Sequence, residues 1–232
     1  MTGKRAFSLR LSLMKFNYEI VFSKRRSVSV AISRFNKITL RCPYGFPRAR
    51  AEKFLADKSA WIEKVIKSNE INFSGNKDII SYKKIFLNGV KVPLSLGCVK
   101  RYISSEGVFV KDIKDVFKLY RSAFSNNFLT ELEIVAQNCG MAYSSVKIKS
   151  YKSRWGCCDG KNNLSFDFKI FMLPERIRNY IVIHELCHTV QHNHSEKFWS
   201  LVGGYIPDYK KIRKELANFD FLTSLYVSVK FR

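Results

Sequence analysis

The chain has 232 residues and is 46% hydrophobic, so it can bury one sizeable core or two smaller ones without disulfide support. Its 41 lysines and arginines exceed its 19 aspartates and glutamates, and the formal net charge of +22 favours an anionic partner or high solubility. The six cysteines have no C-x-x-C spacing, and no apolar run approaches the roughly 18 residues of a membrane helix. Composition therefore argues against a disulfide scaffold and against a membrane-spanning protein.

The first 20 residues begin with basic residues, as a secretory signal does. Arg10 and Lys15 interrupt the apolar core that export requires, so we expect a cytoplasmic protein with reduced thiols. Residues 1–70 hold 16 basic and 5 acidic residues, which is half of the chain's excess charge. No nucleic-acid-binding motif accompanies this charge, so solubility is the favoured interpretation and nucleic acid is a second candidate partner.

Two β-hairpins are predicted in the first half of the chain. Alternating or extended stretches at 27–33 and 38–42 flank a short turn, which predicts the first hairpin. Asn88 and Gly89 stand between two apolar stretches, a strong signal for a two-residue hairpin turn. Further short strands are expected near 98–103 and 108–110.

Helices are predicted on both sides of the second hairpin. Apolar residues at helical spacing between Ala51 and Ile66 predict a helix that ends near Asn69, followed by a loop at 71–78. A longer helix is expected over 113–138, because apolar residues again recur along one face.

The last third of the chain is predicted to alternate strands and helices. Stretches 146–149 and 164–171 indicate strands around a turn at 157–163, and Pro174 is suited to open the next helix. The predicted fold class is α+β. The expected domains are a β-rich basic amino-terminal region, 1–110, and a second domain, 111–232.

All four histidines of the chain lie within eleven positions, and the group begins with His-Glu-x-x-His. Residues four apart lie on one face of a helix, so His184 and His188 can offer two imidazole nitrogens to one metal ion. Glu185 is turned about a quarter of the way round, close enough to act on water beside the metal without being a ligand. This arrangement indicates a catalytic zinc site, in which Glu185 is the general base.

A catalytic zinc site normally has three protein ligands, so a third is required. His192 continues the spacing of four, but each such step drifts by about 40°, which turns it away from His184 on a straight helix. His194 follows a helix-stop signal at Asn193 and precedes Ser195, a suitable N-cap for a new helix. A turn there can return His194 to the metal, and we expect it to be the third ligand.

Residues 153–199 resemble the YgjP-like metallopeptidase domain, a bacterial zincin family related to the SprT-like proteases. The shared features are a Ser-Arg-Trp-Gly turn, a proline before the helix, and Asn-His-Ser followed by Phe-Trp, here at 153–156, Pro174, 193–195 and 198–199. The later stretch 207–210 and the amino-terminal hairpin and helix also fit, so the resemblance covers most of the chain. It implies a zincin-like fold over 111–232.

The resemblance also implies zinc on His184, His188 and His194, with Glu185 as base and acid. Two positions depart from the family pattern: Cys157 stands where serine is expected, and Asp167 where asparagine is usual. Both are expected near the cleft. The candidate substrate contacts are Arg154 and Asp167.

The sequence thus predicts a zinc-dependent metallopeptidase that acts on a protein or peptide. In zincins the substrate lies extended along an edge strand beside the active helix, and the strand at 164–171 is expected to be that edge strand. Two alternatives stay open: a metal-dependent nucleotide phosphohydrolase, which the positive charge would serve, and a nucleic-acid-binding protein with structural zinc.

Several neighbouring residues have a structural interpretation as well as a functional one. Trp155 is expected in the core, Cys187 as a packing residue, and the adjacent Cys157 and Cys158 outside any metal or redox pair. For Arg154 an ion pair and a substrate contact are equally good readings. Tyr205 and Tyr209 follow the third ligand closely, where a hydroxyl could stabilise an oxyanion, but packing is at least as good an explanation.

Overall fold

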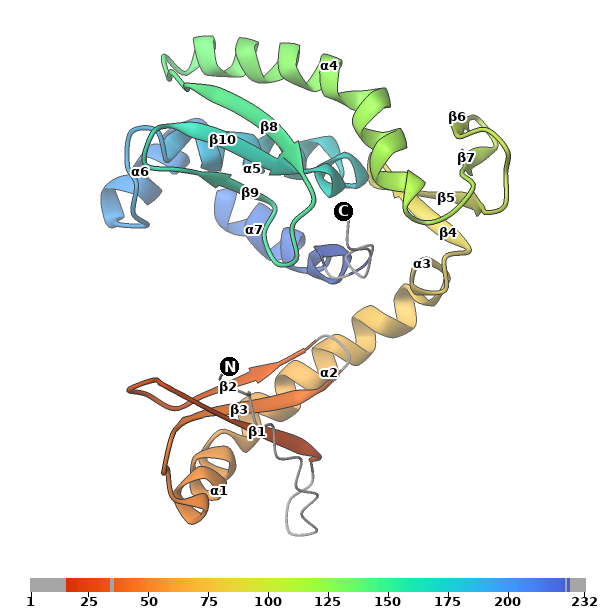
Figure 1. Cartoon of the computed structure of the whole chain (residues 1–232). Helices are drawn as coiled ribbons and strands as arrows, with labels where there is room; N and C mark the ends of the chain where they lie inside the picture. Colours follow the sequence, from red (N-terminus) through yellow and green to blue (C-terminus); the bar gives the residue numbers. More distant parts are fainter. Residues whose placement is uncertain (1–15, 34–35, 224, 226–232) are drawn as a thin grey trace, which may run out of the picture. The chain divides into compact units, whose positions relative to one another are not determined.

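The computed structural model describes residues 16–33, 36–223 and 225, and the chain divides into two compact units, 1–76 and 77–232 (Figure 1). The boundary expected at 110/111 falls inside the second unit, and the start of an independently folding catalytic domain stays a prediction. Arg10 and Lys15, on which the absence of an export signal was argued, lie outside the described residues. Each helix in the described ranges is too short or too polar to span a bilayer.

The first unit contains a three-stranded sheet in the order β1-β3-β2. Strands β2 (Ser29–Ile32) and β3 (Ile38–Pro43) form the predicted hairpin and pair antiparallel. Strand β1 (Tyr18–Ser23) pairs parallel to β3 and was not expected, because a parallel neighbour is not joined by a local turn. Asn36, beside the turn, has a φ of 57°, a conformation that asparagine tolerates better than most residues.

The helical part of the first unit is longer than predicted. Helix α1 (Arg48–Asp57) and helix α2 (Ser59–Gly75) are separated at Lys58, and α2 runs six residues past Asn69. The loop expected at 71–78 is therefore wrong. Asn69 does not end the helix, because its side-chain amide donates to the Ser33 carbonyl and to Asn36 Oδ1.

The second unit begins with helix α3 (Lys77–Ile80) and a four-stranded sheet in the order β4-β5-β7-β6. Its strands are β4 (Lys84–Leu87), β5 (Val90–Ser95), β6 (Tyr102–Ser104) and β7 (Gly107–Phe109). The predicted hairpin is confirmed: Asn88 and Gly89 have φ values of 48° and 84°, as a type I′ turn requires. Gly89 also touches Pro174 so closely that a Cβ would lie 2.6 Å from its ring.

Helix α4 (Asp115–Asn138) confirms the long helix expected over 113–138. It packs on a second sheet of three strands, β8 (Ser145–Lys149), β9 (Gly156–Cys158) and β10 (Asn163–Asp167), in the order β8-β10-β9. Phe128 of α4 meets Phe166 of β10 edge to face, with ring centroids 5.2 Å apart. In Figure 1 this sheet lies between α4 and the later helix α7.

Strand β10 differs from its prediction in length and position. It ends at Asp167, whose carboxylate accepts from the Lys169 backbone amide and caps a 3₁₀ helix, Phe168–Met172. It is the central strand, parallel to β8 and antiparallel to β9, so the expectation that it is the open edge is wrong. Strand β9 occupies residues that were expected to be a turn.

The described part of the second unit ends with three α-helices and a 3₁₀ helix: α5 (Glu175–Cys187), α6 (Glu196–Tyr205), α7 (Tyr209–Ala217) and Asp220–Thr223. Helix α5 follows Pro174 as predicted, but it ends before Asn193, because His188 is already its C-cap. His192 is therefore not on the helix. Ser195 stands at the N-cap position of α6, as expected.

Candidate active site

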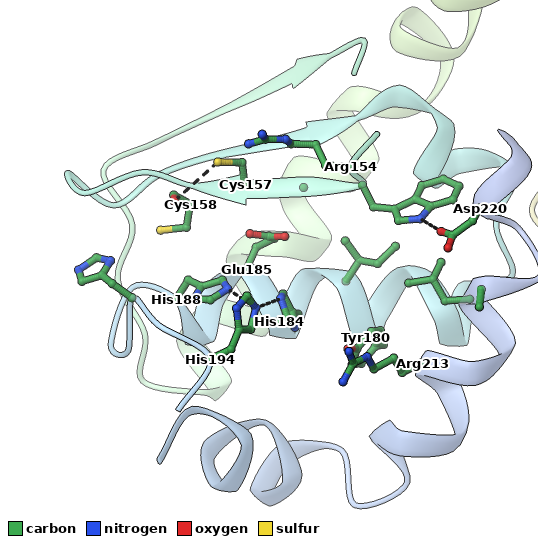
Figure 2. Close-up of a pocket in the computed structure, with 16 residues that line it drawn as sticks. Arg154, Cys157, Cys158, Tyr180, His184, Glu185, His188, His194, Arg213 and Asp220 are labelled. Atoms are coloured by element: carbon green, nitrogen blue, oxygen red, sulfur yellow. Dashed lines mark hydrogen bonds between the residues drawn. The ribbon is translucent and has the colours of Figure 1, made fainter. Parts of the chain in front are cut away.

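The last turn of α5 and the segment before α6 bring three histidine side chains together (Figure 2). The Nε2 atom of His194 lies 3.2 Å from Nε2 of His188 and 3.2 Å from Nε2 of His184. The donor atoms of all three lie within 4.8 Å of one another. His192 is exposed and is not part of this group.

Two of these imidazoles are kept in the neutral form that a metal ligand needs. Burial, together with the charges of the neighbouring histidines, lowers the pKa of His184 to about 3, and burial also lowers the pKa of His188. His188 Nδ1 lies 2.9 Å from the Gln191 carbonyl, so Nδ1 carries the proton and Nε2 has a free lone pair. Three imidazole nitrogens this close to one another can bind a single cation, so the donor set fits a metal ion.

Two aromatic residues of α6 hold the imidazole rings. Phe198 is fully buried and stacks on His188, with centroids 4.3 Å apart and an interplanar angle of 22°. Trp199 stacks on His194, with centroids 5.6 Å apart and an angle of 25°. Because these rings limit the rotamers of the imidazoles, the cluster is preorganised before any ion binds.

Glu185 points into the same cavity and is only 6% exposed. Burial raises the pKa of its carboxyl to about 8, although the charge of Arg154 and a backbone hydrogen bond from Cys158 act in the opposite direction. Gly156 of β9 lies directly against this side chain. A Cβ at that position would be 2.6 Å from Glu185 Cγ and 2.7 Å from Oε1, so the close approach requires glycine.

A cavity of about 530 Å³ opens onto the histidines and Glu185. One wall is α5, which contributes residues from Tyr180 to His188, and the opposite wall is the segment from Arg154 to Cys158. Helix α7 and the turn after it close one end, through Arg213 and Asp220 among others. The cavity is thus assembled from four separate parts of the second unit.

The two candidate substrate contacts are placed differently. Arg154 is exposed on the cavity wall, with its guanidinium 5.6 Å from the Tyr151 ring centroid. Asp167 is 0% exposed and does not line the cavity. Its carboxylate accepts from the Tyr151 backbone amide at 2.6 Å and pairs with Lys169 Nζ at 2.9 Å. Its side chain belongs to the core because strand β10 is central rather than exposed.

Trp155 and the cysteines have mainly structural environments. Trp155 is 8% exposed, and its Nε1–H donates to Asp220 at 3.1 Å, at the edge of the cavity. Cys187 is fully buried, and all six cysteines are free thiols. Cys157 and Cys158 line the cavity, where burial and the nearby Glu185 carboxylate raise the pKa of Cys158 to about 11.

The two tyrosines that follow His194 in sequence lie outside the cavity. The Tyr205 hydroxyl donates to the Cys139 carbonyl at 2.9 Å, and Tyr209 stacks on Trp199 with centroids 5.3 Å apart. Tyr180 and Arg213, in contrast, line the cavity and were not anticipated. Tyr180 stands four residues before His184, a spacing that places both on one helical face; Arg213 has no such local signal.

Comparison with known proteins assigns the chain to a family. Residues 26–219 match the YgjP-like metallopeptidase domain. The crystal structure of the metallopeptidase zymogen abylysin from Pyrococcus abyssi is 27% identical, with a TM-score of 0.34, and the match covers 37% of this chain and 87% of that chain. No curated protein matches significantly. Because the family match extends over most of the sequence, the chain belongs to the YgjP-like metallopeptidase family and is a hydrolase.

Proposed function

We propose that the protein is a zinc-dependent peptidase in which His184, His188 and His194 hold the metal and Glu185 is the general base. The observation that supports this most directly is the convergence of three Nε2 atoms beside the buried Glu185 side chain. Neutral imidazole nitrogens suit zinc, and three protein ligands leave the fourth position open, as in catalytic rather than structural sites.

A zinc ion in this position would supply Lewis acidity and lower the pKa of water. The Glu185 carboxylate accepts a proton from the attacking water, whose oxygen forms a bond to the peptide carbonyl carbon. When the C–N bond breaks, Glu185 returns that proton to the leaving amine. The burial that raises the pKa of Glu185 helps its carboxyl to hold the proton between these steps.

The peptide substrate is best accommodated along β9. This strand pairs with β10 on one side, and no other strand of the described residues pairs with its second side. It contacts the active-site face at Gly156, which touches Glu185. An extended peptide that adds to this edge satisfies the free backbone groups and passes close to the catalytic residues.

The test is hydrolysis of unfolded proteins and internally quenched peptides by the zinc-loaded protein. Glu185→Gln should keep one zinc per chain but lose at least the roughly 100-fold in turnover that a general base contributes. Glu175→Gln is the matched control, since Glu175 is exposed at the start of the same helix. Unchanged turnover in Glu185→Gln would overturn the mechanism.

Nucleic acid is a second candidate partner, because residues 1–70 carry half of the excess charge and all belong to the unit 1–76, whereas the cavity belongs to the unit 77–232. If this charge contacts DNA or RNA, the binding constant should fall linearly with salt concentration on a log–log plot. Absence of binding at low salt would assign the charge to solubility.

We also propose a cytoplasmic location, in line with the free thiols. Membership of a metallopeptidase family favours peptides over nucleotide phosphates as substrates.

A further inference from the structure

The cavity extends past the histidines toward α7, and at this end it has a cationic wall. Arg213 lines the cavity there, beside Tyr180 (Figure 2). Tyr180 and His184, one helical turn apart on α5, line the same cavity. A basic side chain therefore stands within electrostatic reach of the catalytic residues, although neither the proposed metal site nor the general base uses it.

Arg213 is held in this position by Trp199, which also stacks on the His194 ring. Its guanidinium lies 5.0 Å from the Trp199 ring centroid, a cation–π contact. Trp199 stacks in turn on His194 and on Tyr209, which precedes Arg213 by one helical turn. The guanidinium is thus positioned relative to the histidine cluster by a rigid set of rings.

Among the described residues, Arg213 has no carboxylate partner. The nearby Arg176 pairs with both Asp208 and Glu215, which shows that acidic groups on this side of the unit are already engaged elsewhere. The Asp220 carboxylate, at the same end of the cavity, accepts from Trp155 Nε1–H. Arg213 is exposed, and within the described part of the chain none of its five N–H donors is used, so they can bind a ligand.

The direction in which a peptide lies along β9 determines which side of its scissile bond is near Arg213. Strand β9 runs from Gly156, next to Trp155, to Cys158. Antiparallel pairing is the commoner arrangement, and a peptide paired antiparallel to β9 directs its carboxyl-terminal part toward Trp155. Figure 2 shows Arg213 and Tyr180 at that end, and Cys157 and Cys158 at the other.

We propose that Arg213 is a specificity-determining residue that binds a carboxylate of the peptide on the carboxyl side of the scissile bond. This inference rests on the proposed peptidase function. Guanidinium and carboxylate groups form paired, charge-assisted hydrogen bonds, which makes carboxylate the ligand that this geometry selects. The carboxylate comes either from the carboxyl terminus of the substrate or from an aspartate or glutamate side chain.

The experiment compares matched quenched peptides that differ only after the scissile bond. The members of the first pair carry either Glu or Gln at one position after the scissile bond, and this position is varied in turn. The members of the second pair have either a free or an amidated carboxyl terminus. The zinc-loaded protein should cleave the carboxylate member of at least one pair with kcat/KM about tenfold higher, mainly through KM, as expected for an exposed charge-assisted hydrogen bond. The pair that responds identifies the source of the carboxylate.

Variants test whether Arg213 causes the preference. Arg213→Ala should bring the ratio within each pair close to one, and Arg213→Glu should reverse it in favour of a lysine-containing peptide. Lys214→Ala is the control, because Lys214 is an exposed neighbour on α7 that does not line the cavity. Equal cleavage of both members by the unaltered protein, or a ratio that survives in Arg213→Ala, would overturn the proposal while leaving the peptidase function intact.

A binding measurement separates this proposal from the function on which it rests. The peptides are titrated into the zinc-loaded Glu185→Gln variant, with and without Arg213→Ala. If no peptide is cleaved by the unaltered protein, the peptidase function fails; tighter binding of carboxylate peptides that depends on Arg213 would still support the proposed contact. Binding with no such preference would refute it.

Discussion

The two long walls of the cavity differ in how their residues are brought together. On the α5 wall, His184, Glu185 and His188 come from one turn of helix, so their relative positions follow from a spacing of one and four residues. On the opposite wall, Gly156 meets Glu185 only because β9 pairs with a strand that begins seven residues later. The difference shows that a catalytic motif can be local while the space around it depends on tertiary structure.

The strand wall depends on a buried ion pair that does not touch the cavity. Asp167 N–H donates to the Trp155 carbonyl at 2.7 Å, and its carboxylate accepts from the Tyr151 amide. Lys169 Nζ donates to the Tyr151 carbonyl at 3.2 Å and pairs with Asp167. Together these bonds fix both ends of the segment 151–155, which leads into β9.

The largest effect is expected from the residue that completes the helix wall. His194→Ala removes one of three proposed zinc ligands, so zinc affinity should fall by more than the roughly 10- to 100-fold that loss of an outer-shell partner costs. His192→Ala should leave it nearly unchanged, because His192 lies outside the cluster. The zinc content of both variants after dialysis against a chelator decides which histidine is the third ligand. Zinc lost from the His192 variant and kept by the His194 variant would reverse the assignment.

The strand wall should be most sensitive at its buried ion pair. Asp167→Ala leaves the fully buried Lys169 without its carboxylate partner, which should lower the free energy of unfolding by about 3–5 kcal/mol. The double variant with Lys169→Met should recover most of this loss, since no unpaired charge stays buried. Urea unfolding followed by circular dichroism measures both. A loss below about 1 kcal/mol in the single variant would contradict a charged, buried pair.

A smaller but more specific effect is expected where the two walls touch. Gly156→Ala would place a Cβ against the Glu185 carboxylate, and a displacement of about 1 Å costs on the order of 100-fold in rate. Zinc content should be unchanged, because the histidines are not affected. Gly160→Ala is the control, since nothing lies within 4 Å of a Cβ at that position. Equal activity of the two variants would mean that Glu185 can shift without consequence.

The same contrast explains which features the sequence predicts well. The start of α5, the Asn88-Gly89 hairpin and helix α4 depend on local spacing or turn chemistry, and all are confirmed. The end of α2 was misplaced because the Asn69 side chain binds a distant turn instead of ending the helix. Strand β10 was expected at the sheet edge because it was the candidate for the substrate-binding strand, and alternation along one strand does not reveal how many neighbours it has.

The residues of the cavity show the same difference between local sequence signals and tertiary contacts. Glu185 and the histidines that flank it were anticipated from the spacing of one motif, and their roles stay proposals. Arg213 was missed, because no motif includes it and α7 reaches the cavity only through packing against α5. Asp167 was expected near the substrate because it departs from the family pattern. In the structure it ends a central strand, and its carboxylate caps the following 3₁₀ helix instead.

The smallest effect is expected for a residue that is close to the third histidine in sequence but not in function. Tyr205 does not line the cavity, and its hydroxyl donates to the Cys139 carbonyl on the surface. Tyr205→Phe should therefore lower the free energy of unfolding by no more than about 1 kcal/mol, the usual contribution of such a hydrogen bond, and leave peptide hydrolysis unchanged. Steady-state kinetics and urea unfolding of this variant provide the measurement. A selective loss of kcat with normal stability would place the hydroxyl in the reaction, and it would show that proximity in sequence to His194 had been the better guide.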